Sequence, residues 1–267
     1  MYATISKSNK NLKTSIPWGK ATREGNKRVD NSSVEYTNNN HTTVQTTLNR
    51  DGYIFIREWK PEKTTISIGS SIGFVVDIQA LLDSSIPTVQ TLHPRKKSDK
   101  HLNQYSGVFG LEEFPLHTDL AHWEVPPRYI LLRCIEGSQT VQTKLLDSFK
   151  IFPKIDQKII RHALVRPRRS GKDHFLTLLP IKFDIEDKSG IRWDSLFLVP
   201  MNEETKCLSS YLETKCKNII ETLILAKKGD TLIIDNWRIL HGRSKVSKMD
   251  ITRKIERIYL SGLKNEP

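Results

Sequence analysis

The pattern of hydrophobic and polar positions changes near residue 48. Residues 1–48 are polar, rich in Asn and Thr and poor in aliphatic side chains, which is typical of an extension rather than a core element. Apolar runs recur from residue 49 onward. We therefore expect a polar N-terminal extension over residues 1–48 and a single folded domain over residues 49–267.

Within that domain, the spacing of apolar side chains predicts many strands and few helices. Short runs with aromatic and β-branched bias indicate strands at residues 53–59, 88–92, 129–135, 143–146, 174–179, 231–236 and 255–260. Helical spacing or turn signals indicate helices at residues 61–73, 156–165 and 202–226. Because alternating βαβ order is absent from this list, we expect a mainly β fold, an all-β barrel or jelly roll decorated with helices.

Composition limits the class of protein. The 267 residues, 37% hydrophobic and 27% charged, describe a globular chain whose apolar stretches fall short of the roughly 20 residues of a membrane span. The three cysteines form no CxxC pair and leave one thiol unpaired in any disulfide scheme, which favours reduced thiols. We therefore expect a cytoplasmic protein without a membrane segment.

Charge raises the question of a polyanionic partner. The net charge of +12, from 42 Lys and Arg against 30 Asp and Glu, attracts nucleic acids or acidic small molecules. The basic clusters at residues 95–100 and 166–172 contain no interleaved aromatic side chains, unlike a base-stacking groove. A solvated basic surface is therefore the preferred interpretation, and nucleic-acid binding remains an alternative.

Candidate metal ligands begin with His117 and Asp119. Residues two apart in an extended segment point to the same face, so the imidazole and the carboxylate can converge on one cation. A His-x-Asp pair is a weak signal alone, and His122 and Glu124 repeat the spacing nearby. Five residues from His117, this rival pair would face the opposite side of a continuous strand, so we assign it to structure.

The distal segment GDTLIIDNWRILHGR, residues 229–243, strengthens the first pair. It begins with an apolar strand, continues through a turn and delivers His241, which can act as a third ligand. Two imidazoles and one carboxylate on one face of an octahedral iron leave three positions for cosubstrate and dioxygen. The same three ligands could also serve zinc-dependent hydrolysis.

His117-Thr118-Asp119, the distal segment and an Arg-x-x-x-Arg at Arg253 and Arg257 occur in an order that resembles taurine dioxygenase-like and clavaminate synthase-like oxygenases. The resemblance spans roughly residues 50 to 260. It implies a double-stranded β-helix, which is a distorted jelly roll, and Fe(II) with 2-oxoglutarate and dioxygen as cosubstrates. It also implies that His117, Asp119 and His241 are the metal ligands and the catalytic centre.

Further roles follow from the resemblance residue by residue. Arg253 resembles the arginine that binds the far carboxylate of 2-oxoglutarate, a role suited to a planar guanidinium. Thr140 resembles the hydroxyl that binds the same carboxylate, although this chain has one glycine where the family pattern has two, and Thr143 is a substitute. Arg257 resembles a position that backs the cosubstrate or binds an anionic substrate. Asn103 resembles part of a substrate lid.

The implied activity is oxidation of a C–H bond, by default hydroxylation, in a small anionic or amino-acid-derived molecule of specialised metabolism. Because Asp119 is present where related halogenases have a small residue, halogenation is disfavoured. Two alternatives stay open. The first is an oxygenase directed at nucleic acid or ribonucleoprotein, and the second is a member of the fold that binds a metabolite without turnover.

Overall fold

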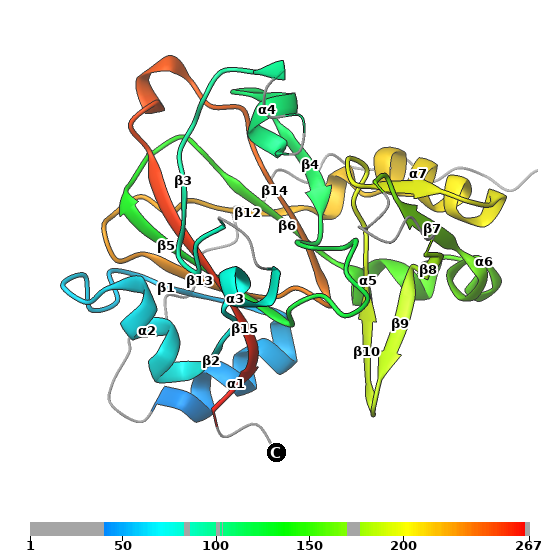
Figure 1. Cartoon of the computed structure of the whole chain (residues 1–267), viewed down its shortest axis with the longest axis horizontal. Helices are drawn as coiled ribbons and strands as arrows, with labels where there is room; N and C mark the ends of the chain where they lie inside the picture. The colour runs from blue at the N-terminus through cyan, green and yellow to red at the C-terminus, as the bar shows by residue number, and fades with distance from the viewer. Residues whose placement is uncertain (1–39, 83–85, 100–101, 103, 170–176, 265–267) are drawn as a thin grey trace, which may run out of the picture. The chain divides into compact units, whose positions relative to one another are not determined.

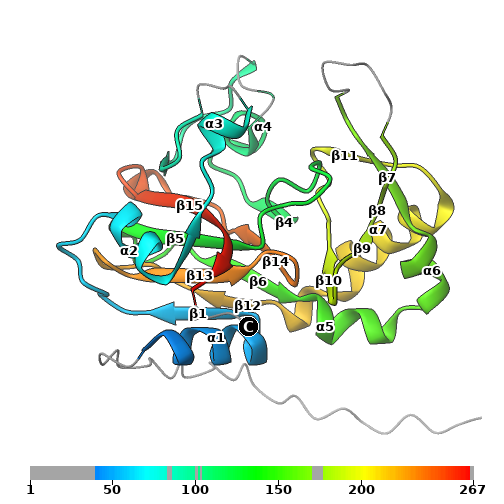
Figure 2. The same cartoon turned by 60° about the horizontal axis from the view of Figure 1, so that its bottom comes forward.

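The structure, a computed structural model, describes residues 40–82, 86–99, 102, 104–169 and 177–264 (Figure 1). All of them belong to one compact unit, Ser33–Pro267. Two antiparallel sheets form the centre of this unit (Figures 1 and 2). Among the described residues, no helix has both the length and the apolar character needed to cross a membrane.

The larger central sheet contains six strands within the described residues, in the order β1-β13-β5-β15-β2, with β3 also paired to β15. Their bounds are β1 (Tyr53–Ile56), β2 (Gly73–Val75), β3 (Gln90–Leu92), β5 (Tyr129–Glu136), β13 (Thr231–Asp235) and β15 (Lys254–Leu263). The smaller central sheet has the order β12-β6-β14-β4. Its strands are β4 (Phe114–His117), β6 (Thr143–Asp147), β12 (Glu221–Leu223) and β14 (Ile239–Arg243).

The two faces of the larger sheet bury different side chains because successive residues of a strand point to opposite sides. Ile130 of β5 and Tyr259 of β15 pack in a core that also contains residues of the smaller sheet, among them Leu145 and Ile239. Leu131 packs on the opposite face, in a second core. The odd-numbered positions 255, 257 and 259 of β15 therefore face the space between the sheets.

Helices cover the opposite face of the larger sheet (Figure 2). They are α1 (Asn40–Asp51) and α2 (Thr65–Ile72), and Val44 and Leu48 of α1 are 2% and 1% exposed. The boundary expected at residue 48 thus falls inside α1, and the folded part extends N-terminally of it. Residues 1–39 lie outside the described residues.

A third core lies beside the central sheets. It is built around the strands β11-β7-β8 and the helices α6 and α7. A hairpin of β9 and β10 adjoins it (Figure 1). The bounds are β7 (Leu164–Pro167), β8 (Leu179–Pro180), β9 (Lys182–Ile185), β10 (Lys188–Ile191), β11 (Leu198–Pro200), α6 (Gln157–His162) and α7 (Glu203–Lys215). The remaining short helices are α3 (Ile78–Leu82), α4 (Tyr105–Phe109), α5 (Ser148–Ile151), η2 (Phe152–Lys154), η3 (Lys217–Ile219) and η4 (Lys248–Asp250).

The mainly β prediction is confirmed, with corrections to individual elements. The helix predicted over residues 202–226 is too long, because α7 ends at Lys215 and β12 pairs with β6 in the register Glu221↔Leu145. The helix predicted over residues 156–165 ends earlier, since Leu164 begins β7. Residues 174–176 of the strand predicted at residues 174–179 lie outside the described residues, and Leu179 begins β8. The structure also adds β14, which the sequence indicated only as a turn before His241.

Candidate metal centre

Two neighbouring strands of the smaller sheet bring the candidate imidazoles together. His117 ends β4, and its register partner in β14 is His241, so their ring centroids are 4.5 Å apart. The glycine after His241 allows this approach, because a Cβ on Gly242 would lie 2.7 Å from the carbonyl oxygen of Phe114. Strand pairing thus joins two ligands that are far apart in the sequence.

Asp119 follows β4 and is fixed by the turn between β13 and β14. Its backbone N–H donates to Oδ1 of Asn236 at 2.8 Å. The Asn236 amide group donates in return to the carbonyl oxygens of Asp119 and Pro127, both at 3.0 Å. The distal segment therefore supplies His241 and also anchors the backbone of the proximal carboxylate.

The three side chains converge on one point and are buried, with 6%, 7% and 7% of His117, Asp119 and His241 exposed. Their ligand atoms all lie within 4.8 Å of one another. Oδ1 of Asp119 lies 3.5 Å from Nε2 of His117 and 3.7 Å from Nε2 of His241. One carboxylate oxygen thus lies near both of the imidazole nitrogens that would hold a metal ion with it.

The protonation states of His117 and Asp119 also favour binding of a metal cation. The Nδ1–H of His117 donates to the carbonyl oxygen of Pro115 at 2.9 Å, which leaves the lone pair on Nε2, toward Asp119. Burial alone would raise the pKa of Asp119, but the Arg257 guanidinium and both imidazoles hold it well below its usual value. The carboxylate is thus ionised, and the donor set fits an iron or zinc ion.

Arg257 lies against this carboxylate. Its Nη1 donates to Oδ2 of Asp119 at 2.8 Å, and its Nη2 donates to Oε1 of Gln90 at 2.5 Å. The Tyr259 hydroxyl, two residues along the same face of β15, donates to the same oxygen of Asp119 at 3.1 Å. Arg257, which was expected to bind the substrate or support the cosubstrate, is therefore hydrogen-bonded to a metal-ligand candidate.

A second region of positive charge contains Arg253 and Arg243. Arg253 is 7% exposed, and its side chain makes no hydrogen bond within the described residues. Burial lowers the pKa of Arg253 to about 10. Burial, and then the nearby Arg253, lower the pKa of Arg243 to about 10. Two close guanidinium groups, one buried and one partly buried, form a region that favours an anion.

Arg243 shares a face of β14 with His241 because the two residues are two positions apart. Its guanidinium lies over the Phe114 ring, 3.7 Å from the ring centroid. Its Nη2 donates to the carbonyl oxygens of Gly110 and Glu112 at 3.0 and 2.7 Å. These contacts orient the Arg243 side chain. Arg243 was not among the site residues expected from the sequence, although its spacing of two residues from His241 indicates a shared strand face.

The hydroxyl candidates separate clearly. Thr140 is exposed, and its hydroxyl donates to Oδ2 of Asp250 at 2.7 Å. Thr143 is 5% exposed and is the register partner of Arg243 on the neighbouring strand. The structure thus places the substitute, Thr143, beside Arg243 and Thr140 at the surface. Asn103 lies outside the described residues.

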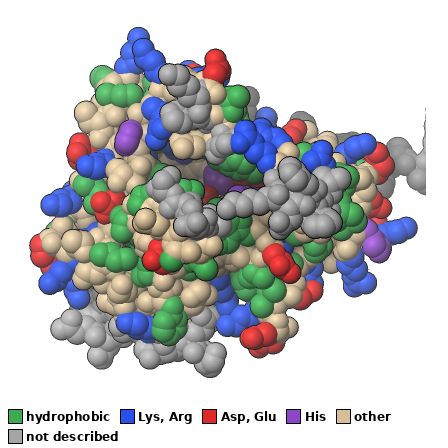
Figure 3. All heavy atoms as spheres, viewed as in Figure 1, with side chains coloured by type: hydrophobic (Ala, Val, Ile, Leu, Met, Phe, Trp, Pro, Cys, Tyr) green, Lys and Arg blue, Asp and Glu red, His purple; other side chains and the backbone are tan. Residues whose placement is uncertain are grey.

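Sequence reasoning also missed Tyr105 and Asp194. The Tyr105 ring stacks on His117 with a centroid separation of 4.1 Å and an angle of 20°. Its hydroxyl donates to Oδ1 of Asp194 at 2.8 Å. Neither residue lies in a motif, so no signal in a single sequence marks them. Figure 3 shows histidine side chains within a hollow on one face of the molecule.

Two facing β-sheets with a buried His-Asp-His set on their shared side define the class of mononuclear non-haem iron oxygenases. The family described as "Taurine catabolism dioxygenase TauD, TfdA family" matches residues 11–168, and the chain belongs to this family. The expectation of an Fe(II)- and 2-oxoglutarate-dependent dioxygenase is thereby confirmed.

Solved structures of oxygenases share the fold. One is asparagine oxygenase in complex with Fe(II), 2S,3S-3-hydroxyasparagine and succinate, at 15% identity and a TM-score of 0.59, covering 83% of this chain and 79% of that chain. OrfP in complex with Fe, succinate and (3S)-hydroxy-L-Arg is 14% identical, with a TM-score of 0.62, and the match covers 84% of this chain and 81% of that chain. PvcB from Pseudomonas aeruginosa is 16% identical, with a TM-score of 0.58, and the match covers 85% of this chain and 84% of that chain. The expected double-stranded β-helix is confirmed.

Proposed function

We propose that this protein hydroxylates a C–H bond of a small amino-acid-derived molecule with Fe(II), 2-oxoglutarate and dioxygen. The observation that carries the proposal is the buried His117, Asp119 and His241 set together with a buried Arg253 side chain that has no hydrogen-bond partner in the described part of the chain. A buried guanidinium that is not hydrogen-bonded to an anion is unfavourable until an anion binds it. The far carboxylate of 2-oxoglutarate is such an anion.

Each residue of the site has a role in this proposal. His117, Asp119 and His241 would hold the iron, which with 2-oxoglutarate and dioxygen supplies the oxidation and yields succinate and carbon dioxide. Arg253 would bind the far carboxylate through two parallel N–H donors. Arg243 and the hydroxyl of Thr143 would complete that anion site. Burial of these groups excludes water and strengthens each electrostatic contact.

The substrate class is supported by the names of the structural relatives. Asparagine oxygenase was solved with a hydroxylated asparagine, and OrfP with a hydroxylated arginine. PvcB is described as an oxygenase from an isonitrile synthetic pathway. We therefore propose a small-molecule substrate and retain a cytoplasmic location, in keeping with three free cysteines. The nucleic-acid alternative stays a prediction from net charge and is tested by oligonucleotide binding with a steep salt dependence.

The test is addition of Fe(II) and 2-oxoglutarate under anaerobic conditions, followed by visible spectroscopy. A weak metal-to-ligand charge-transfer band is expected for the wild-type protein and not for His241→Ala. His162→Ala is the matched control, because His162 is exposed and its Nδ1 lies 2.9 Å from the carbonyl oxygen of Lys158 on its own helix. Absence of the band in the wild type, or its persistence in His241→Ala, would contradict the proposal.

A further inference from the structure

Asp194 is tied to the metal-ligand segment through its neighbour in the chain. The N–H of Thr118, which lies between His117 and Asp119, donates to the carbonyl oxygen of Trp193 at 2.7 Å. The N–H of Trp193 donates in return to Oγ1 of Thr118 at 3.1 Å. This reciprocal pair fixes the backbone beside Asp194 against the backbone between the two proximal ligand candidates.

The carboxylate of Asp194 is 3% exposed and asymmetrically bonded. Oδ1 accepts hydrogen bonds from the Tyr105 hydroxyl at 2.8 Å and from the N–H groups of Leu196 and Phe197 at 2.7 and 2.8 Å. Oδ2 accepts none from the described residues, and no Lys or Arg among them forms an ion pair with Asp194. Burial raises the pKa of this carboxyl group. Burial alone therefore favours the neutral acid, and a cation at the open oxygen would stabilise the ionised form.

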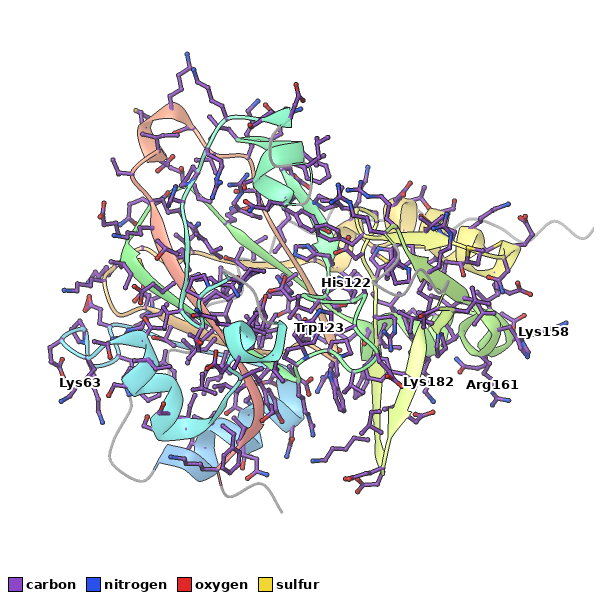
Figure 4. All side chains as sticks on the ribbon, in the orientation of Figure 1. Lys63, His122, Trp123, Lys158, Arg161 and Lys182 are labelled. Atoms are coloured by element: carbon purple, nitrogen blue, oxygen red, sulfur yellow. The ribbon has the colours of Figure 1, made fainter. Side chains whose placement is uncertain are left out.

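The surroundings of Asp194 suit an organic ligand. Tyr105 bonds to Asp194 and stacks on His117, so it links the carboxylate directly to the metal centre. The His122 ring lies 5.9 Å from the Phe197 ring, and its buried Nδ1 has no hydrogen-bond partner in the described residues. Figure 4 labels His122 on the segment that follows the proximal ligands. Aromatic walls with a few unsatisfied polar atoms are typical of small-molecule sites.

The other strong charges at the centre are already committed. Arg257 pairs with Asp119, and Arg253 with Arg243 forms the anion site assigned above to 2-oxoglutarate. Of the charged groups described at this centre, the Asp194 carboxylate is thus one that no ion pair neutralises, and the group complementary to it is positive. This narrows the expectation of an anionic or amino-acid-derived substrate to molecules with a protonated nitrogen.

We propose that Asp194 binds a protonated nitrogen of the substrate, either an ammonium or a guanidinium group, through its Oδ2 atom. The proposal rests on the proposed function, because it places the substrate next to the iron held by His117. It makes Asp194 a specificity-determining residue. An ammonium on the α-carbon and a cationic side chain share this chemistry, so the choice of probes must separate them.

The test uses Asp194→Asn in the anaerobic Fe(II) and 2-oxoglutarate complex. The amide oxygen can still accept the three bonds made to Oδ1, so the loop keeps its contacts while the negative charge is removed. Glu124→Gln is the control, because Glu124 is an exposed acid on the segment after the proximal ligands. The measurement is the dissociation constant for each probe, from its perturbation of the charge-transfer band.

The probes are L-arginine, Nα-acetyl-L-arginine, L-asparagine and N-acetyl-L-asparagine. Loss of one charge-assisted bond should weaken binding of the recognised cation by about 10- to 100-fold in Asp194→Asn and little in Glu124→Gln. If Asp194 holds a guanidinium, Nα-acetyl-L-arginine binds as L-arginine does. If it holds an α-ammonium, both acetylated probes fail.

Equal binding by Asp194→Asn and wild type would overturn the inference, as would failure of every probe with a protonated nitrogen to bind the wild type. In both cases an intact charge-transfer band leaves the proposed function standing. Absence of that band in the wild-type protein is instead a failure of the proposed function itself, so the two outcomes are distinguishable.

Discussion

The guanidinium of Arg257 and the carboxylate of Asp119 form a partly buried ion pair with an N–O distance of 2.8 Å. It involves Oδ2, whereas Oδ1 is the oxygen that approaches His117 and His241. The Tyr259 hydroxyl reaches the same Oδ2. With that oxygen held by two donors, the carboxylate presents one oxygen to a metal. Arg257 and Tyr259 thus position a ligand.

Arg257→Gln should therefore weaken metal binding. Removal of a group that orients a metal ligand typically costs 10- to 100-fold in affinity, and we expect a loss of about that size for Fe(II). Tyr259→Phe should cost less, because the charged donor remains. Anaerobic titration calorimetry gives both values, with Arg161→Gln on the exposed side of α6 as the control. Unchanged metal affinity in Arg257→Gln would contradict this role and would support a role for Arg257 in binding the substrate.

A second prediction concerns the cosubstrate. Arg253→Gln should raise the dissociation constant of 2-oxoglutarate by about 100-fold, since a bidentate charge-assisted contact is lost. Arg243→Gln should raise it by about 10-fold, because Arg243 already donates to two backbone carbonyl groups. Titration of the charge-transfer band measures both constants. A larger effect at Arg243 than at Arg253 would reverse this assignment.

Replacement of the two candidate threonines provides a third prediction. Thr143→Val should weaken 2-oxoglutarate binding by several-fold, because its buried hydroxyl lies on the strand beside Arg243. Thr140→Val should leave the binding unchanged, because its hydroxyl bonds to Asp250 at the surface. The same titration compares the two variants. Weaker 2-oxoglutarate binding in Thr140→Val alone would show that Thr140, as expected from the family pattern, supplies the hydroxyl.

The strand periodicity explains why part of the site was predictable. His117 and Asp119 are two residues apart, so the sequence indicates a shared face without any knowledge of the fold. The distal segment adds His241 as a motif. The pairing of His241 with His117 is different, because it depends on the register between β14 and β4. A single sequence does not contain that register.

The remaining contacts depend on tertiary packing. The partner of Arg257 is 138 positions away in the chain, and Asp194 meets Tyr105 from 89 positions away. No local pattern encodes either pair. The helix predicted over residues 202–226 failed for a related reason, since its last residues pair with β6, and tertiary pairing overrides local propensity.

A fourth prediction concerns stability near the distal ligand. Arg238 forms a bidentate pair with Asp147 at 2.9 and 2.6 Å. It also donates to the carbonyl oxygens of Asn49 and Arg50 at the end of α1. Arg238→Met leaves the Asp147 carboxylate buried and unpaired, so we expect a loss of about 3 kcal/mol in the free energy of unfolding.

Urea unfolding measures this loss, and Lys206→Met is the control. Lys206 and Glu203 form an exposed pair on α7, and such pairs contribute less than about 1 kcal/mol. Similar free energies of unfolding for the two variants would show that the buried pair between Arg238 and Asp147 has no special role in holding α1 to the turn before His241.

A fifth prediction tests the expectation of reduced cysteines. Cys207 is exposed on α7, whereas Cys134 and Cys216 are buried. Burial raises the pKa of Cys134 to about 11, and it also raises the pKa of Cys216. The reactive species is the thiolate, and a raised pKa reduces its amount at neutral pH.

Iodoacetamide should therefore add one group rapidly to the native protein and three to the denatured protein, as counted by mass spectrometry. Cys207→Ser should abolish the rapid addition, and fast labelling of Cys134 in the native protein would contradict its placement between the sheets.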